Sequence, residues 1–429
     1  MKLTSFLVIF IFASLLCQGQ TTTQSPYSYY GIGDVNTRSF ANQRSLGGAH
    51  TAAASPLMVN TLNPATFGNL THTTFAVDIN MDFRKIESST VTQPTNNTYF
   101  NNLAIAFPLG KRGGMAASLR QFTKIGYNIN IQQEDPDIGN YEFIYDGQGG
   151  INEFLFGAGY NVYQDTNTTI SIGANFLYYF GFAETNRRTD NFDTDANALS
   201  SNIQRKTSVN DISFDFGLYA DHRFSKNFKI GFGGSYTPSR KLKAKQSSLT
   251  YTYRKILGDE IPKDSTEVID AQGTITMPSS LNIGLSFYLG KSWKVFTDYK
   301  TQKWSDLEVF NNPQNLNDRT EYSIGVENQP NADALAKYIQ GVNYRVGFRY
   351  ADTRLKVYGN DLTEYAITAG LGLPIMKTKS KSSINLGIEF GSRGEKGSNL
   401  VEETFTNIFL GVSFNPHKFD TWFKKSKYN

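Results

Sequence analysis

Cysteine is almost absent from this chain, whose 429 residues include only Cys17. That residue lies in an N-terminal stretch that begins with Lys2, continues with the apolar run 7–16 and ends near Gly19. This is the pattern of a cleaved secretory signal peptide, which we place at residues 1–19. A lipoprotein signal is disfavoured because Leu16, and not a small residue, precedes the cysteine. The predicted mature chain is therefore exported and has no disulfide or thiol chemistry.

Long apolar runs and catalytic motifs are also missing. After the signal peptide no window approaches the roughly 18 apolar residues of a membrane-spanning helix. The sequence contains no G-x-S-x-G, H-E-x-x-H or P-loop motif, and His50, His72, His222 and His417 lack metal-ligand spacing. We therefore predict no catalytic residues, no metal site, no cofactor and no enzymatic activity. A triad built from distant residues stays an alternative, because triads are defined by geometry.

Charge of one sign is not in large excess either, since 42 basic residues face 38 acidic ones. This near balance excludes a nucleic-acid-binding surface. Aromatic residues, in contrast, are abundant: they make up 14% of the chain, with 24 Tyr and 32 Phe. In an exported protein without spanning helices, such a content favours a β-barrel, whose outer band and interfacial girdles use aromatic side chains.

The clearest strand pattern is at residues 75–84, where apolar and polar residues alternate strictly. Phe75, Val77 and Phe83 belong to one face, and Asp78 and Asp82 to the other. A strand places alternate side chains on opposite faces, so this segment predicts one stave with a lipid side and a polar side. Similar segments recur up to residue 414. Counting them gives fourteen or fifteen, and a closed antiparallel barrel needs an even number, so we predict about 14 strands.

The connections between these segments alternate in length. Short ones are expected at residues 108–114, 164–168, 225–227 and 290–292, and long polar ones at 126–150, 183–210 and 256–272. Short periplasmic turns and long extracellular loops are typical of outer-membrane barrels. The predicted class is all-β, an antiparallel transmembrane β-barrel at residues 73–414. A basic-aromatic tail at 415–429 is expected to lie in the periplasm, either as an anchor at the membrane surface or as a docking peptide for a periplasmic partner.

The segment before the first strand is irregular and rich in small residues. Residues 45–68 lack a helix or strand period and resemble the N-terminal hatch of FadL-type outer-membrane proteins, a group that includes fatty-acid transporters and Bacteroidetes secretion barrels. The residues that carry this resemblance are Gly47, Gly48, Ala49, Ala52, Ala53, Asn63, Pro64 and Ala65. A second match covers residues 277–287 and 293–305. The resemblance implies a hatch (residues 20–72) inside the lumen and a protein of the Bacteroidetes type of this group.

Candidate site residues fall into two further groups. Polar side chains expected to face the lumen are Asp78, Asp82, Arg84, Asp211, Asp215, Asp298 and Glu389. Residues that interrupt strand regularity, and so mark a candidate lateral opening, are Gly231, Gly233, Gly234 and Pro278. Whether the hatch moves or only seals the pore is left open.

Two functions follow from the resemblance. The first is a FadL-like channel for uptake of hydrophobic small molecules such as long-chain fatty acids. The alternative is a non-transporting subunit of an outer-membrane secretion or assembly complex, with envelope partners bound through the tail or the long loops. A secreted β protein outside the membrane is a third, weaker option. The expected location is the outer membrane, with its lipids as partners and no nucleic acid.

Overall fold

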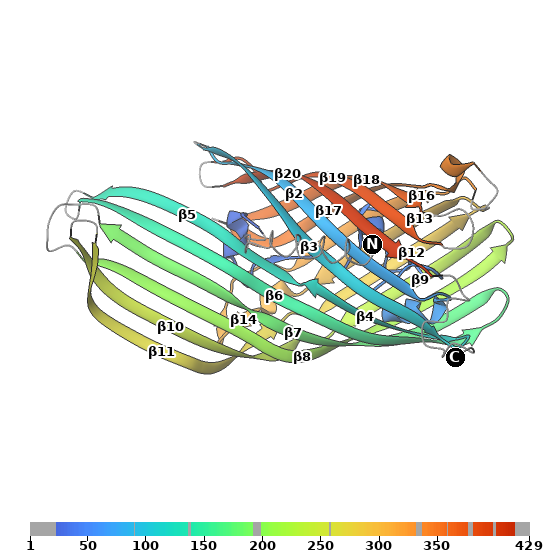
Figure 1. The fold of residues 1–429 in the computed structure, drawn as a ribbon, viewed down its shortest axis with the longest axis horizontal. Coiled ribbons are helices and arrows are strands. Elements are labelled where there is room, and N and C mark those ends of the chain that lie inside the picture. Colours follow the sequence, from blue (N-terminus) through green and yellow to red (C-terminus); the bar gives the residue numbers. More distant parts are fainter. Residues whose placement is uncertain are drawn as a thin grey trace, which may run out of the picture.

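The computed structural model describes residues 23–89, 91–135, 139–191, 199–256, 259–331, 337–357, 359–375, 381–397 and 400–416. The predicted signal peptide and residues 417–429 of the predicted tail lie outside this part of the chain. Among the described residues, no helix has the length and apolar character needed to cross a membrane. The described chain is dominated by one antiparallel sheet that closes on itself (Figure 1).

The wall is a closed antiparallel β-barrel of 14 strands, which confirms the predicted fold class. Closure comes from pairing of the first wall strand with the last, for example Ile79 with Leu410. The uninterrupted strands are β2 (Thr74–Glu87), β3 (Thr92–Leu109), β6 (Gly139–Gln164), β7 (Thr168–Asn191), β8 (Ser200–Ser225), β13 (Trp293–Gln302), β16 (Arg319–Asn328), β17 (Asn343–Val357), β18 (Asn360–Pro374), β19 (Ser383–Arg393) and β20 (Glu402–Phe414).

The remaining wall strands are each interrupted once. They are β4 (Gly113–Gln121) with β5 (Thr123–Asp135), β9 (Phe228–Thr237) with β10 (Arg240–Ile256), and β11 (Asp259–Met277) with β12 (Ser280–Leu289). At the first interruption the partner changes: β4 pairs with β3 and β6, whereas β5 pairs with β6 and with β1 (Asp34–Val35). Beyond the interruption at Phe122, this wall strand is therefore no longer paired with β3. Small elements outside the wall are η3 (Trp304–Asp306), β14 (Glu308–Val309), β15 (Asn312–Pro313) and η4 (Tyr338–Gly341).

Side chains alternate across the wall as the sequence predicts. On β2, Asp78 and Asp82 are buried, whereas Ile79 and Phe83 are 39% and 45% exposed. Tyrosines form a row on the outer surface, because Tyr299 lies opposite Tyr322 across β13 and β16, and the register continues through Tyr350 to Tyr365 on β17 and β18. An outward apolar band bordered by such a row is typical of an outer-membrane barrel.

The long polar connections predicted at 126–150, 183–210 and 256–272 are mostly strands, so that prediction was wrong. The described residues there belong to β5, β6, β7, β8, β10 and β11, which extend well past the rest of the barrel (Figure 1). β6 and β8 have 26 residues each, whereas β13 and β16 have 10. Outside the apolar band both faces of a strand meet water, so the alternation used to recognise strands is lost. We call this part the extended sheet.

Candidate functional site

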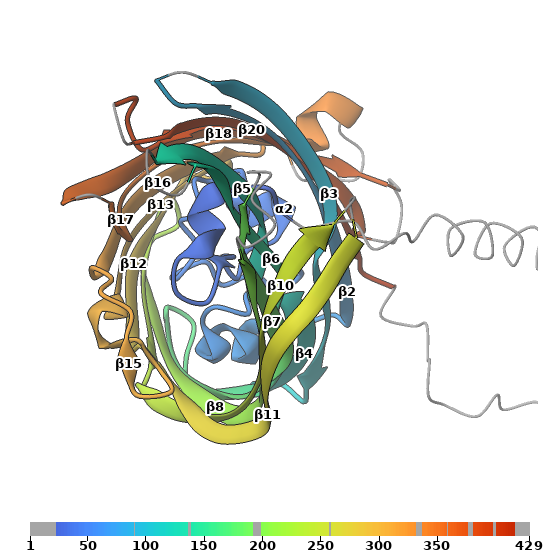
Figure 2. The same cartoon turned by 90° about the vertical axis from the view of Figure 1, so that its left-hand side faces the viewer.

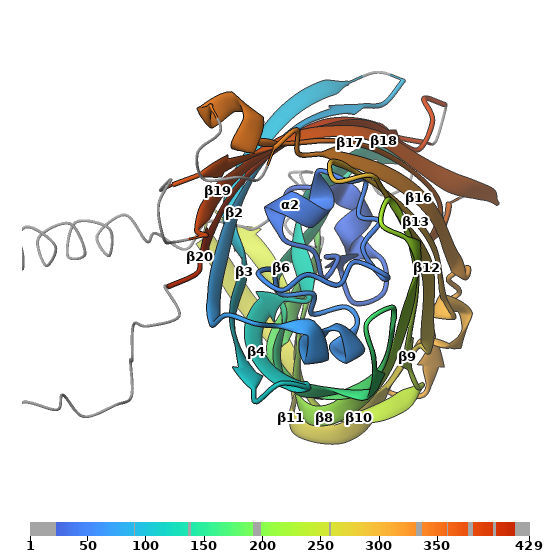
Figure 3. The ribbon, with the colours of Figure 1, turned by 90° about the vertical axis from the view of Figure 1, so that its right-hand side faces the viewer.

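Residues 23–73 lie inside the barrel and are here called the luminal segment (Figures 2 and 3). The segment contains η1 (Pro26–Tyr29), the short strand β1, α2 (Ala41–Arg44) and η2 (Pro64–Asn69). Both 3₁₀ turns begin with a polar cap followed by proline: Ser25 Oγ accepts from the amide of Tyr27, and Asn63 Oδ1 accepts from that of Ala65. Proline has no N–H to leave unpaired at a helix start, which fixes these two turns locally.

The luminal segment rests on inward-facing glycines of the wall, which we call the glycine ring. A Cβ added at any of them would come within 3.0 Å of an atom of the luminal segment. The ring consists of Gly114, Gly159, Gly173, Gly217, Gly233, Gly284, Gly325 and Gly347, on β4, β6, β7, β8, β9, β12, β16 and β17. Glycine in a strand permits this close approach of another backbone. The wall is thus shaped to hold the segment in contact.

Buried ion pairs fasten the segment at Arg38. Its guanidinium contacts Glu153 on β6 at 2.9 Å and also pairs with Asp215 on β8. Glu153 receives a second arginine, Arg120, at 2.8 Å, and Asp215 accepts from Asn175 at 2.7 Å. Both carboxylates are fully buried. Charges buried in this way are stable only while paired, so Arg38 ties the segment to two wall strands, β6 and β8.

Two further carboxylates of the wall hold backbone groups of the segment. Asp298 Oδ2 on β13 accepts from the amides of His50 and Thr51 at 2.8 and 2.9 Å and from the Thr51 hydroxyl at 2.7 Å. Asp78 on β2 accepts from the amide of Ala41, at the start of α2. On the other side, the Asn63 side chain donates to the carbonyl of Leu218 on β8 at 2.9 Å.

A second buried ion cluster holds the first part of the segment. Arg393 on β19 contacts Asp34 at 3.0 Å and Glu403 on β20 at 2.6 Å. Burial disfavours the charged form of Asp34, but the Arg393 guanidinium outweighs burial and holds the pKa of this carboxyl well below its ordinary value. Glu403 also accepts from the Ser25 hydroxyl at 2.6 Å and pairs with Arg84 at 2.5 Å. Asp34 and Ser25 of the luminal segment are therefore held by side chains of β19 and β20.

Two small cavities lie between the luminal segment and the wall, in addition to a larger one of about 400 Å³ beside Thr23 and Pro26 at the start of the segment. The first, of about 120 Å³, is bordered mainly by charged side chains that include Arg44, Arg84 and Glu389. The second, of about 110 Å³, is bordered by charged and polar residues, among them Arg38, His50 and Lys300, and by apolar residues. Both volumes are well below the roughly 300–1,000 Å³ of ordinary small-molecule sites.

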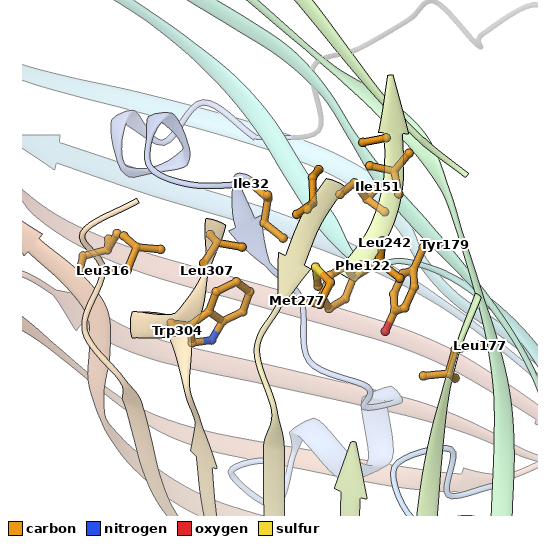
Figure 4. Close-up of a cluster of buried hydrophobic side chains, with 14 of the residues drawn as sticks. Ile32, Phe122, Ile151, Leu177, Tyr179, Leu242, Met277, Trp304, Leu307 and Leu316 are labelled. Carbon is orange, nitrogen blue, oxygen red and sulfur yellow. The ribbon is translucent and has the colours of Figure 1, made fainter. Parts of the chain in front are cut away.

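Some of the apolar residues that border the second cavity belong to a buried layer near the interruptions of the wall (Figure 4). Phe122, Tyr179, Met277 and Trp304 are members of the layer that also border the cavity. Ile32 joins it from the luminal segment. The luminal segment is therefore held by apolar packing against residues of β7, β11 and η3 in addition to the ion pairs.

The sequence-predicted residues divide clearly by position. The hatch residues Gly47, Gly48, Ala49, Ala52, Ala53, Asn63, Pro64 and Ala65 all belong to the luminal segment. Asp78, Asp82, Asp215, Asp298 and Glu389 are buried, and Arg84 is paired inside the barrel. Asp211 lies apart, at a half-buried position on β8 where it accepts from the amide of Lys243.

The residues predicted for a lateral opening do not lie together at one break in the wall. Pro278 lies in the interruption between β11 and β12 and borders the second cavity. Gly231, Gly233 and Gly234 lie within β9, where pairing with β8 and β12 is continuous. Gly233 belongs to the glycine ring.

Sequence reasoning missed Arg38, Glu153 and the glycine ring. One signal was available: several predicted strands carry a glycine on the polar parity, where it would face the lumen. Arg38 offered no such signal, because Glu153 and Asp215 are 115 and 177 residues away.

Together these features define a 14-stranded outer-membrane-type barrel with an occupied lumen. The same fold occurs in the CymD monoaromatic hydrocarbon channel (TM-score 0.55, 15% identity, 90% of this chain and 99% of that chain covered). It also occurs in the Pseudomonas putida toluene transporter TodX (0.54, 17%, 90% and 99%) and in a Pseudomonas aeruginosa FadL homologue (0.56, 10%, 90% and 100%). The TM-scores over nearly the whole of each chain show a shared fold.

The family itself is given by a match over residues 1–429: the chain belongs to the BamG family. A search of curated proteins finds no significant match.

Proposed function

We propose that this chain is an outer-membrane barrel that works as a subunit of a protein assembly or secretion complex, with its lumen closed by its own N-terminal segment. The observation that carries the proposal is the seating of that segment on the glycine ring, reinforced by the buried Arg38 and Arg393 ion pairs. A barrel closed in this way acts through its outer surfaces. Membership of the BamG family supports the same proposal.

The extended sheet supplies surface for such contacts. It projects past the apolar band, and side chains such as Val268 and Ile269 on β11 are 44% and 71% exposed there. Tyr141 and Phe143 on β6 pack edge to face at 5.2 Å in the same region. Exposed aromatic and aliphatic side chains beyond the lipid are the kind of feature that protein interfaces use.

The proposal predicts a stable set of envelope proteins that copurify with the full chain from native membrane in mild detergent. Mass spectrometry of the purified material identifies both proteins and small molecules. Deleting residues 418–429 is expected to weaken the complex while leaving the barrel heat-modifiable on gels, which shows that it still folds. Recovery of a stoichiometric apolar molecule with no protein partner would contradict the proposal.

A channel for small hydrophobic molecules is the second candidate, favoured by the second cavity. This cavity is bordered in part by apolar residues and borders Pro278, at an interruption of the wall. At about 110 Å³ it is nearer to a single-ring hydrocarbon than to a long-chain fatty acid.

The channel predicts that filling this cavity blocks uptake. Met277 borders the cavity and is 8% exposed, so Met277→Trp is expected to reduce toluene influx into proteoliposomes at least severalfold. Met81→Trp, on the outward side of β2, is the matched control and is expected to leave influx unchanged. Equal influx through wild type, both variants and protein-free liposomes would count against the channel.

A further inference from the structure

The first luminal cavity contains an imbalance of charge. It lies beside Gly47 and Gly48, between α2 and the wall, and has a volume of about 120 Å³. One water takes about 30 Å³ in the liquid, so the cavity has room for a small ion together with water. Its border includes cationic side chains from the luminal segment and from several wall strands.

Most of these cations are matched by carboxylates. Arg84 contacts Asp82 at 2.8 Å, Arg319 contacts Glu321 at 2.5 Å, Arg349 contacts Glu389 at 3.2 Å, and Arg393 contacts Asp34 at 3.0 Å. Arg354 has no carboxylate partner among the described residues, but it donates to the carbonyls of Tyr30 and Gly33. The carboxylates bordering the cavity are thus already engaged.

Besides Arg354, two cations that border the cavity have no carboxylate within 4.0 Å in the described part of the chain. Arg44, in the last turn of α2, stacks over the Phe409 ring at 4.6 Å, and its Nη1 is buried with no hydrogen-bond partner. Lys124 on β5 is 5% exposed, and its Nζ lies 3.8 Å from the centre of the Tyr99 ring. Lys124 also forms a hydrogen bond with the Tyr99 hydroxyl, and Arg44 interacts electrostatically with the same hydroxyl, so both cations lie near it. A buried cation without a counter-charge is costly.

Unmatched acceptors border the same cavity. Asp82 contributes Oδ1 and Asn407 contributes Oδ1, and both atoms are buried and lack a hydrogen-bond partner among the described residues. A ligand that satisfies this set must accept from Arg44 and Lys124 and donate to an acceptor. Hydrogen phosphate does both, because it is an anion that keeps an O–H group. Sulfate at neutral pH accepts only.

We propose that this cavity binds one inorganic phosphate ion, held by Arg44 and Lys124 and donating its O–H to Asp82. This inference goes beyond the proposed function and does not rest on it, since a luminal anion site is compatible with either a subunit or a channel. Its effect would be to neutralise the cations between α2 and the wall and so to strengthen the seat of the luminal segment.

The test is thermal unfolding of the full chain in detergent, titrated with phosphate or sulfate at constant ionic strength. We expect a saturable rise in Tm with phosphate. The apparent affinity for sulfate is expected to be at least about tenfold weaker, because sulfate leaves the Asp82 acceptor unpaired. Glycerol phosphate distinguishes a free ion from a phosphate ester: because the cavity has a volume of only about 120 Å³, the larger ester is expected to leave Tm unchanged.

Variants locate the site. Lys124→Gln is expected to weaken phosphate binding about tenfold or more, whereas Lys124→Arg keeps the charge and retains binding. Lys303→Gln is the matched control, because Lys303 is 56% exposed and pairs with Asp318 outside the cavity. If Lys124→Gln fails to fold, the phosphate-to-sulfate comparison on wild type still decides.

Three results would overturn the inference. One is the absence of a saturable phosphate effect. Another is an equal, non-saturating rise with both salts, which is the general effect of kosmotropic anions. The third is saturable binding that Lys124→Gln leaves unchanged.

Discussion

Gly233→Val is expected to lift the luminal segment from the wall. A Cβ at this position would come within 3.0 Å of the Thr51 carbonyl, and backbone on both sides leaves little room for adjustment. Overpacking of this kind typically costs about 1–3 kcal/mol. The expected results are a lower midpoint of heat unfolding, faster proteolysis within residues 23–73, and measurable ion conductance in planar bilayers.

The neighbouring residue provides a matched control. Gly234 lies on the same strand, but its side-chain position points away from the segment, and the nearest atom to an added Cβ is 3.9 Å away. Gly234→Val is therefore expected to leave unfolding, proteolysis and conductance close to wild type. If the two variants behave alike, the glycine ring does not hold the segment.

Arg38→Met is expected to have the largest effect of any single charge removal. The change leaves Asp215 buried with only Asn175 as a partner, while Glu153 still has Arg120. Removing one partner of a buried ion pair typically costs about 3–5 kcal/mol. Urea unfolding of the purified barrel, followed by tryptophan fluorescence, measures the loss.

A second substitution separates charge from packing. Adding Asp215→Asn to Arg38→Met removes the carboxylate that has lost its arginine partner and is expected to restore part of the stability. Lys245→Met is the exposed control, because Lys245 and Asp270 are 57% and 59% exposed, and loss of such a pair costs at most about 1 kcal/mol. If the double variant is no more stable than Arg38→Met, the buried charge is not the cause of the loss.

The parts of the fold that face lipid were predictable from sequence, and the parts that face water were not. Val77, Ile79 and Phe83 alternate with polar residues because lipid lies on one side and the lumen on the other. In the extended sheet that contrast disappears, and residues such as Gln204 and Arg205 on β8 look like a loop although they are paired on both sides.

The site was predictable as a location but not as a mechanism of attachment. Residues 45–68 read correctly as irregular, small-residue chain next to the first wall strand. The contacts that secure them depend on register between distant strands, as with Arg38 and Asp215. Gly233 was predicted as a break in strand regularity. In the structure a glycine is required there because the backbone of Thr51 and Ala52 lies against it.

The Asp34–Arg393 and Ser25–Glu403 contacts have a consequence for biogenesis. They join residues 359 and 378 positions apart, so they form only when the last strands of the wall are in place. The luminal segment is nevertheless enclosed by the barrel, which the pairing of β20 with β2 closes. The luminal segment is therefore expected to reach these contacts only when the final strand arrives, so that closure and filling of the barrel are coupled late in folding.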